Sequence, residues 1–250
     1  MGGPMGTLVI DIGNTRLAWR LREPSGVVSG GSASHAAIAD ALSSLPLVEA
    51  IAISSVQRSH EGELQQWIEA THQPPPIWIR SGADLPSTVK TDEPHHTGAD
   101  RALCAFAWGC ADEQGPAIII DAGTAVTVDA VNPSGQLLGG WIAPGWSALQ
   151  RGLQQAAPAL PQMSEEQSEE ASVPWSGETS RAIRGGIESM FVEGVLGLRR
   201  RVESELGNDA TTVITGGDAD RLLSALQPAR SQPDMVLDGL ERILESGTHG

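Results

Sequence analysis

Several features that mark other classes of protein are absent from this chain. It contains no tyrosine and only two cysteines among 250 residues, and its 16 Lys and Arg are outnumbered by 31 Asp and Glu. Cys104 and Cys110 are too few for a disulfide framework and lack CxxC spacing, which favours buried thiols in a reducing compartment. The formal net charge of −15 argues against nucleic acid as the main partner, because phosphate backbones require clustered Lys and Arg.

Long apolar runs are also missing. No segment approaches the roughly 18 apolar residues of a membrane span, so no membrane partner is expected. The first residues, 1–7, have neither the basic and apolar regions of a signal peptide nor a myristoylation signal, since position 6 is Gly6. The sequence therefore predicts a cytoplasmic protein. The chain is long enough for one large domain or two modest ones.

The clearest pattern lies in the middle of the chain. Three β-branched residues, 118–120, predict a buried strand that ends on Asp121, Gly123 and Thr124, and alternating residues over 126–130 predict a returning strand. A glycine in such a turn lets a ligand approach the backbone, and successive N–H groups form a concavity for anions. Asp121 can hold a cation beside a phosphate. Taken alone, this tetrapeptide is also compatible with an ordinary hairpin that has a polar corner.

The same pattern occurs near the start of the chain. Apolar residues 8–10 precede Asp11, Gly13 and Thr15, and a second strand returns over 16–22. Two copies of strand, polar turn and strand predict an internal duplication of a hairpin module. Two phosphate-binding turns on duplicated α/β domains are what a phosphotransferase requires.

The rest of the chain alternates strand and helix patterns, which indicates an α/β protein. Further strands are expected from Val27, at 50–56, 77–79 and 212–217, and helices at 34–45, 61–71, 98–110, from 146, over about 179–202 and at 219–226. The long helix contains four glycines, each costing up to ~1 kcal/mol relative to Ala. They suggest a close helix–helix approach, for example in a dimer, although a weak helix also explains them. The acidic segment 162–174 is expected to be a surface loop, and no role is assigned to it.

The paired turns resemble those of the actin, sugar-kinase and heat-shock ATPase superfamily, in which two ribonuclease-H-like domains bind ATP in a cleft between them. Four blocks between residues 11 and 145 narrow this resemblance, which extends over nearly the whole chain: DIGNTR at 11–16, GADR at 98–101, DAGTAVTVD at 121–129 and GGWIAPG at 139–145. Together they resemble type III pantothenate kinases, which phosphorylate the primary hydroxyl of pantothenate with ATP at the start of coenzyme A synthesis. The expected domains are 1–114, with the first phosphate turn and GADR, and 115–250, with the second turn and an adenosine motif at Gly216-Gly217.

The resemblance also implies roles for individual residues. The expected ATP contacts are Asp11, Ile12, Gly13, Asn14, Thr15, Arg16, Leu17, Ala18 and Thr124. The expected pantothenate contacts are Gly98, Ala99, Asp100, Arg101 and Thr179. Asp100 becomes the catalytic base, whereas the residues alone slightly favour a simple aspartate at a helix start. Asp11 is expected to act on Mg²⁺ through its waters, and Asp121 to hold K⁺ or NH4⁺. The resemblance further implies a homodimer whose substrate pocket is completed across the interface.

One departure from the family pattern concerns the substrate pocket. Family members often carry an aromatic residue, commonly tyrosine, a few positions before GADR, whereas residues 90–94 here contain none. Two alternative functions remain open at this point: a non-catalytic accessory factor in transcription with the same fold, and a kinase of another small alcohol such as a sugar. Retention of Asp11, Asp100 and Asp121 argues against the first, and the short chain with its GADR block argues against the second.

Overall fold

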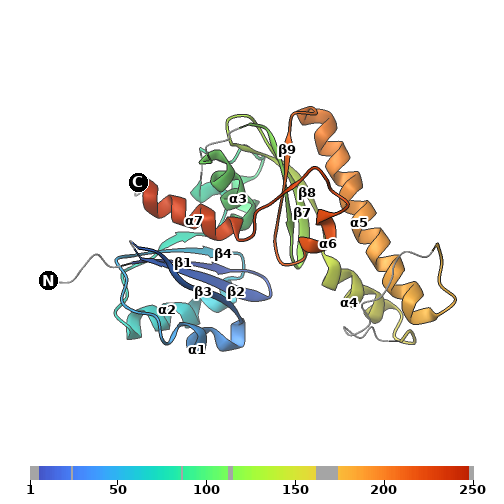
Figure 1. The fold of residues 1–250 in the computed structure, drawn as a ribbon. Coiled ribbons are helices and arrows are strands. Elements are labelled where there is room, and N and C mark those ends of the chain that lie inside the picture. Colours follow the sequence, from blue (N-terminus) through green and yellow to red (C-terminus); the bar gives the residue numbers. More distant parts are fainter. Residues whose placement is uncertain (1–5, 24, 86, 112–114, 162–173, 248–250) are drawn as a thin grey trace. The chain divides into compact units, whose positions relative to one another are not determined.

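The computed structural model describes residues 6–23, 25–85, 87–111, 115–161 and 174–247. Its framework is two five-stranded sheets, ordered β3-β2-β1-β4-β5 and β10-β9-β6-β7-β8 (Figure 1). The chain divides into two compact units, which are described separately. The first contains Met1–Gly115, Val131–Gly139 and Asp234–Gly250, and the second contains Pro116–Ala130 and Gly140–Pro233.

The first unit is a mixed sheet covered on both faces. Its strands are β1 (Thr7–Ile12), β2 (Arg16–Glu23), β3 (Gly26–Ser34), β4 (Ala50–Ser55) and β5 (Ile77–Ile79), and its helices are α1 (Ile38–Leu42), α2 (Glu61–Ala70), α3 (Ala99–Gly109) and α7 (Met235–Ser246). α1 and α2 cover one face of this sheet, and α3 and α7 cover the other (Figure 1). Because side chains alternate along β1, Ile10 packs with residues of α1 and α2, whereas Val9 packs with residues of α3 and α7. The residues that follow the strand ends therefore lie at one edge of a fully covered sheet.

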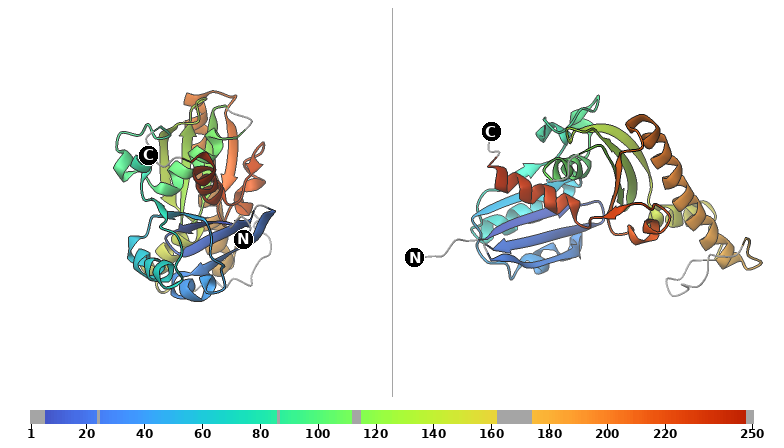
Figure 2. Two further views of the ribbon diagram at one scale, coloured as in Figure 1. Left: turned by 90° about the vertical axis from the view of Figure 1, so that its left-hand side faces the viewer. Right: turned by 45° about the horizontal axis from the view of Figure 1, so that its top comes forward.

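The second unit is built from the other sheet and a long helix. The strands of this sheet are β6 (Ala117–Ala122), β7 (Ala125–Val131), β8 (Leu137–Pro144), β9 (Thr211–Thr215) and β10 (Arg230–Ser231), although Val131 and the first three residues of β8 fall in the first unit. The helices of the second unit are α4 (Trp146–Ala156), α5 (Thr179–Leu206) and α6 (Asp220–Leu223). α5 runs along one face of this sheet (Figure 2). Its Phe191 and Val195 pack with the sheet residues Ile118, Ile120 and Val126. No helix within the described ranges is long and apolar enough to cross a membrane.

The two sheets repeat one topology. β6, β7, β8, β9 and β10 occupy, in that order, the sheet positions of β1, β2, β3, β4 and β5. β4 runs parallel to β1, and β9 runs parallel to β6. The internal duplication that the two polar turns predict is therefore confirmed by the sheet order.

Two helices expected from the sequence are shorter than predicted. The pattern over 34–45 gives α1 only at Ile38–Leu42, because β3 continues to Ser34 and pairs there with Arg16 of β2. The pattern over 219–226 gives only the four residues of α6. In both places apolar residues occur at helical spacing, but strand pairing or a turn determines the conformation of the backbone. Propensity is a weak guide where tertiary pairing competes with it.

The last helix of the chain packs on the first sheet. α7 contacts α3, β1 and β4, and its Leu237, Leu240 and Ile243 are buried. The compact units therefore add this C-terminal segment and 131–139 to the N-terminal part. The ribonuclease-H-like domains expected at 1–114 and 115–250 stay a prediction.

Ion pairs fix α7 to the neighbouring hairpin. The Arg20 guanidinium donates hydrogen bonds to Asp238 at 2.8 Å and Glu241 at 3.2 Å, and it lies 3.3 Å from Asp234. Arg22 donates to the same Glu241 at 2.8 Å. Burial alone would lower the pKa of Arg20, but the hydrogen bond to Asp238 and the surrounding carboxylates raise it. The nearly buried Glu241 is thus neutralised by two arginines.

Candidate active site

The first polar turn is a three-residue connection, 13–15, between β1 and β2. The Gly13 N–H donates to the Arg16 carbonyl at 3.0 Å, which closes the turn. Asn14, Thr15 and Arg16 are exposed, and the Arg16 guanidinium donates to the Ser32 hydroxyl of β3 at 3.0 Å. The turn therefore presents polar groups to solvent at the edge where β1 ends, which is the arrangement expected of a phosphate-binding turn.

Asp11, the last polar residue of β1, has a strongly perturbed carboxyl group. Its Oδ1 is buried and has no hydrogen-bond partner. The pKa of Asp11 is raised to about 7, mainly by burial and then by the Asp100 charge, while the Ser54 hydroxyl offsets part of this rise. A buried carboxylate without a partner is costly. Its environment is incomplete in the protein alone and suits a cation.

Asp100 lies in the first turn of α3, as its position in the GADR block predicts. The Arg101 N–H donates to Asp100 Oδ1 at 2.8 Å. Burial raises the pKa of Asp100, and Arg101 offsets part of this effect through its N–H and its charge. Gly98 precedes the helix, and a Cβ there would collide with Asp100 Oδ1, so only glycine leaves room for this carboxyl orientation. The first turn and the GADR block, distant in sequence, are thus brought together through Asp11 and Asp100.

The segment before GADR, where relatives often carry an aromatic residue, is held by hydroxyl groups instead. Thr91 Oγ1 and Thr97 Oγ1 are 2.6 Å apart, and Thr97 donates to the Glu93 carbonyl at 3.1 Å. The Lys90 N–H donates to the Leu137 carbonyl at 2.8 Å. The segment is therefore ordered by its own polar contacts, without an aromatic anchor.

The second polar turn, Gly123-Thr124, is one residue shorter than the first. The Gly123 N–H donates to the Ala125 carbonyl at 3.0 Å, and the Gly145 N–H donates to the Thr124 carbonyl at 3.1 Å. A Cβ on Gly145 would collide with the Gly123 carbonyl, so the block GGWIAPG needs glycine where the chain crosses this turn. α4 begins at the next residue, Trp146, which places a helix N-terminus beside the turn. Such an end favours anions.

Asp121, the next-to-last residue of β6, pairs with Thr215, the last residue of β9. Gly216 follows with φ +90°, and a Cβ at that position would collide with Asp121 Oδ1 and the Ala122 carbonyl. Only glycine therefore lets β9 end this close to Asp121. The sequence suggested an adenine contact for this glycine pair, and the structure adds a packing reason for the first glycine. Thr179, the remaining expected substrate contact, is exposed at the start of α5.

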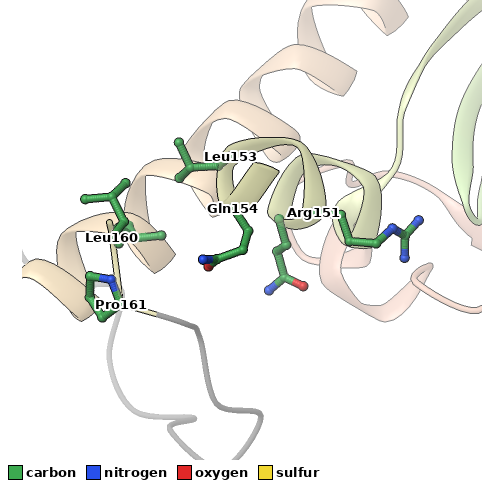
Figure 3. Close-up of a pocket in the computed structure, with 7 residues that line it drawn as sticks. Arg151, Leu153, Gln154, Leu160 and Pro161 are labelled. Atoms are coloured by element: carbon green, nitrogen blue, oxygen red, sulfur yellow. The ribbon is translucent and has the colours of Figure 1, made fainter. Parts of the chain in front are cut away.

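A cavity of about 190 Å³ lies elsewhere in the second unit, between α4 and α5. Figure 3 shows Arg151, Leu153, Gln154, Leu160 and Pro161 around it, and Gln150 and Ile183 complete the lining. None of these is an expected site residue.

In the part of the chain that the structure describes, no group of three or more His, Cys, Asp or Glu is placed to hold a metal ion. A cation at Asp11 would thus depend on few protein ligands.

Comparison with known folds agrees with the sheet topology. A Campylobacter jejuni protein described as a Baf-family transcriptional activator has a TM-score of 0.60 at 19% identity, covering 96% of this chain and 98% of that one. An MreB protein of Spiroplasma citri, solved bound to AMPPNP, has a TM-score of 0.52 at 10% identity, covering 98% and 97% of the two chains. At these identities the likeness concerns the fold, which is that of the actin-like ATPases.

Comparison of sequences is more specific. The model of the type III pantothenate kinase family matches residues 7–201, and this range holds every expected catalytic, substrate and phosphate contact. A type III pantothenate kinase of Marinobacter nauticus is 33% identical over 249 residues, covering 96% of this chain and 98% of the relative. With the duplicated fold and the Asp11–Asp100 pair, these matches show that the chain belongs to the type III pantothenate kinase family.

Proposed function

We propose that Asp100 is the general base of pantothenate phosphorylation in this chain. It would take the proton from the primary hydroxyl of pantothenate while the γ-phosphoryl group of ATP transfers to that oxygen. The observation that carries this proposal is the proximity of Asp100 to Asp11 at the end of β1, next to the phosphate turn. A raised pKa makes a carboxylate a stronger base, and a positioned base contributes typically ~10²–10⁴-fold to the rate.

Asp11 suits a hydrated Mg²⁺. Its buried, partnerless Oδ1 is a hard oxygen ligand, and Mg²⁺ retains several waters when few carboxylates bind it. Lys90 is the only lysine in the chain, so neutralisation of the phosphate charge falls to arginines, backbone N–H groups and cations. The bound ion would supply charge neutralisation on the phosphate oxygens. Asp11 itself would orient the waters of that ion.

The first turn is the proposed phosphate site of the first unit. Asn14, Thr15 and Arg16 are exposed around a glycine whose Cβ, if present, would lie 3.2 Å from the Arg16 carbonyl. Ile12, Leu17 and Ala18 belong to the strands that hold this turn and would contact ATP mainly through their backbone. In the second unit Thr124 is the proposed ATP contact, supported by the N-terminus of α4 beside it.

Asp121 is the proposed site for K⁺ or NH4⁺. Its Oδ1 and the Ala122 carbonyl both face Gly216, so two oxygens gather where β9 ends. Oxygen ligands of this kind suit a monovalent cation. The pantothenate contacts proposed are Gly98, Ala99, Arg101 and Thr179, with the hydroxyl-rich segment at Thr91 and Thr97 in place of the family's aromatic residue.

A homodimer is proposed from the exposed face of α5. Gly186, Met190 and Gly194 follow one another at four-residue spacing and are exposed, with Met190 at 68%. A Cβ at either glycine would meet nothing within 4 Å, so packing within the chain does not explain them. A second copy of the helix that approaches this face would explain both the glycines and the exposed methionine.

ADP release from ATP tests the proposed function. The wild-type chain is assayed with and without pantothenate, with Mg²⁺ or EDTA, and in K⁺ or Na⁺ buffer. We expect pantothenate-dependent turnover that needs Mg²⁺ and is faster in K⁺. Turnover with a sugar but not with pantothenate would assign the site to another alcohol. ATP binding without turnover on any alcohol would favour a regulatory role.

A further inference from the structure

Two buried polar atoms without partners belong to residues that are paired across neighbouring strands of the first sheet. Within the described residues, six buried side-chain polar atoms lack a hydrogen-bond partner, and Asp11 Oδ1 and Ser54 Oγ are two of them. Ser54 is fully buried at the end of β4. β1 and β4 are parallel neighbours, and their register places Ser54 directly opposite Asp11. Two of the six partnerless atoms thus belong to residues that are directly opposite one another on β1 and β4.

Strand alternation places both side chains on the face that α3 covers. Asp11 and Ser54 continue the rows of Val9 and Ala52, which pack against Leu103 of α3. The Ser54 hydroxyl is close enough to lower the pKa of Asp11, although no hydrogen bond of ordinary length and angle joins them. Ser55, the next residue, belongs to the opposite face and lies near Glu61 of α2. Of these two serines, it is therefore Ser54 that lies on the same face of the sheet as the carboxyl groups of Asp11 and Asp100.

The duplicated half repeats this pairing. In the second sheet β6 and β9 are parallel neighbours, and their register places Thr215 opposite Asp121. Thr215 is buried, as Ser54 is. Each half of the molecule therefore carries a hydroxyl residue opposite the aspartate of its polar turn, which a chance polar residue at a strand end does not explain.

We propose that Ser54 is a positioning residue for the Asp11 carboxylate. Its hydroxyl donates to that carboxylate, or to a water bound between them, when a hydrated divalent cation is present. A buried hydroxyl without a partner destabilises the folded protein, so the protein alone carries a penalty that the loaded site removes. Hydrogen-bond partners of this kind fix the orientation of the side chains that bind a metal ion. The inference rests on the proposed role of Asp11.

Mn²⁺ binding tests this inference without relying on turnover. Free Mn²⁺ is measured by electron paramagnetic resonance in the presence of a non-hydrolysable ATP analogue. Removing such an orienting partner weakens metal affinity by roughly 10–100-fold, and we expect about 10-fold for Ser54→Ala. Ser54→Thr, which keeps the hydroxyl and copies Thr215, should retain most of the affinity. In turnover assays Ser54→Ala should raise the KM for MgATP more than it lowers kcat.

Ser55→Ala is the matched control. It removes a neighbouring buried hydroxyl that also lacks a partner but lies on the other face, so it should leave Mn²⁺ affinity unchanged. Urea unfolding without cation should give both alanine variants the same midpoint as the wild type, because each variant removes a hydroxyl that has no partner.

Asp11→Asn separates this inference from the proposed function. If Asp11→Asn abolishes Mn²⁺ binding while Ser54→Ala and Ser55→Ala both match the wild type, the Ser54 inference is overturned and the role of Asp11 stands. An equal loss in both serine variants would also overturn it, because the effect would not depend on the face. If the wild type binds no Mn²⁺ with the nucleotide analogue, the role of Asp11 fails, and the Ser54 inference with it.

Discussion

The carboxyl groups of Asp11 and Asp100 lie near one another at the end of β1, although the two residues are distant in sequence. Both groups have a raised pKa because they are buried. Asp11 comes from a strand end and Asp100 from a helix start. The Asp100 charge disfavours ionisation of Asp11, and a cation bound at Asp11 would offset this repulsion. If Asp100 is the base and Asp11 holds the ion, the two sites are coupled electrostatically, as a kinase needs when nucleotide and cation arrive together.

The pKa of Asp11 predicts a pH-dependent stability in the absence of cations. The folded protein keeps this proton up to about pH 7, whereas the unfolded chain releases it near 3.8. The free energy of unfolding should therefore fall as pH rises from 4 to 7, by roughly 1.4 kcal/mol per unit of pKa difference. Urea titrations in EDTA should show this fall in the wild type and a shallower one in Asp11→Asn. Parallel profiles for the two proteins would contradict the assigned pKa.

The sequence predicted Asp11 and Asp100 but not their neighbour Ser54. Both aspartates lie in local motifs with recognisable spacing, whereas Ser54 is a small polar residue at the end of an apolar strand. Its placement depends on the register between β1 and β4, which pairs residues more than forty positions apart. The glycine Gly145 was within a recognised block, but its close approach to Gly123 is visible only in three dimensions.

Among the secondary-structure elements, α7 depends most on contacts distant in sequence. Arg20→Ala should destabilise the protein by about 3 kcal/mol, because it leaves the buried Glu241 with Arg22 alone and Asp238 without its arginine. Arg242→Ala is the control on the same helix. Its pair with Glu245 is exposed, at 51% and 52%, so the loss should stay below about 1 kcal/mol. Equal losses in urea unfolding would show that the buried cluster does not anchor α7.

Gly239 on α7 provides a second test of this packing. A Cβ there would lie 2.5 Å from the Leu103 carbonyl of α3, so Gly239→Ala must push the two helices apart. We expect a loss of about 1–3 kcal/mol, typical of overpacking. Gly62→Ala, on α2 with open space around it, should instead be neutral or stabilise by up to about 1 kcal/mol. In thermal unfolding, Gly239→Ala should melt at a lower temperature than the wild type, whereas Gly62→Ala should melt at the same or a higher temperature. A Gly239→Ala variant as stable as the wild type would contradict the close contact.

Element positions followed well from the sequence where periodicity was strong, as in β4, α2, α3 and α5. They were less accurate where pairing decided the outcome. β3 extended through 29–34, which are small residues without a strand pattern, because β2 offers them a complete ladder of backbone partners. The assignment of α7 to the first unit could not be predicted, since no local pattern states which sheet an amphipathic helix will cover.

For the molecule as a whole, the duplication was the most predictable feature, because two copies of one polar turn carry it. Self-association is the property of the whole molecule that the exposed face of α5 predicts. Met190→Glu should convert the proposed homodimer to a monomer, because it places a charge in the face made by Gly186, Met190 and Gly194. Light scattering should give twice the chain mass of 26.2 kDa for the wild type and the chain mass for the variant. Glu188→Gln, elsewhere on α5, is the control and should not change the mass.

The most direct test of the account compares Asp100→Asn with the wild type in pantothenate-dependent ADP release, with MgATP affinity measured on the same preparations. The side chains are nearly the same size, so the variant should fold and bind MgATP as the wild type does. If Asp100 is the general base, kcat should fall by roughly 10²–10⁴-fold while MgATP affinity changes little. A variant that keeps the wild-type kcat would contradict the account and would leave the transfer to a site in which Asp100 only shapes the start of α3.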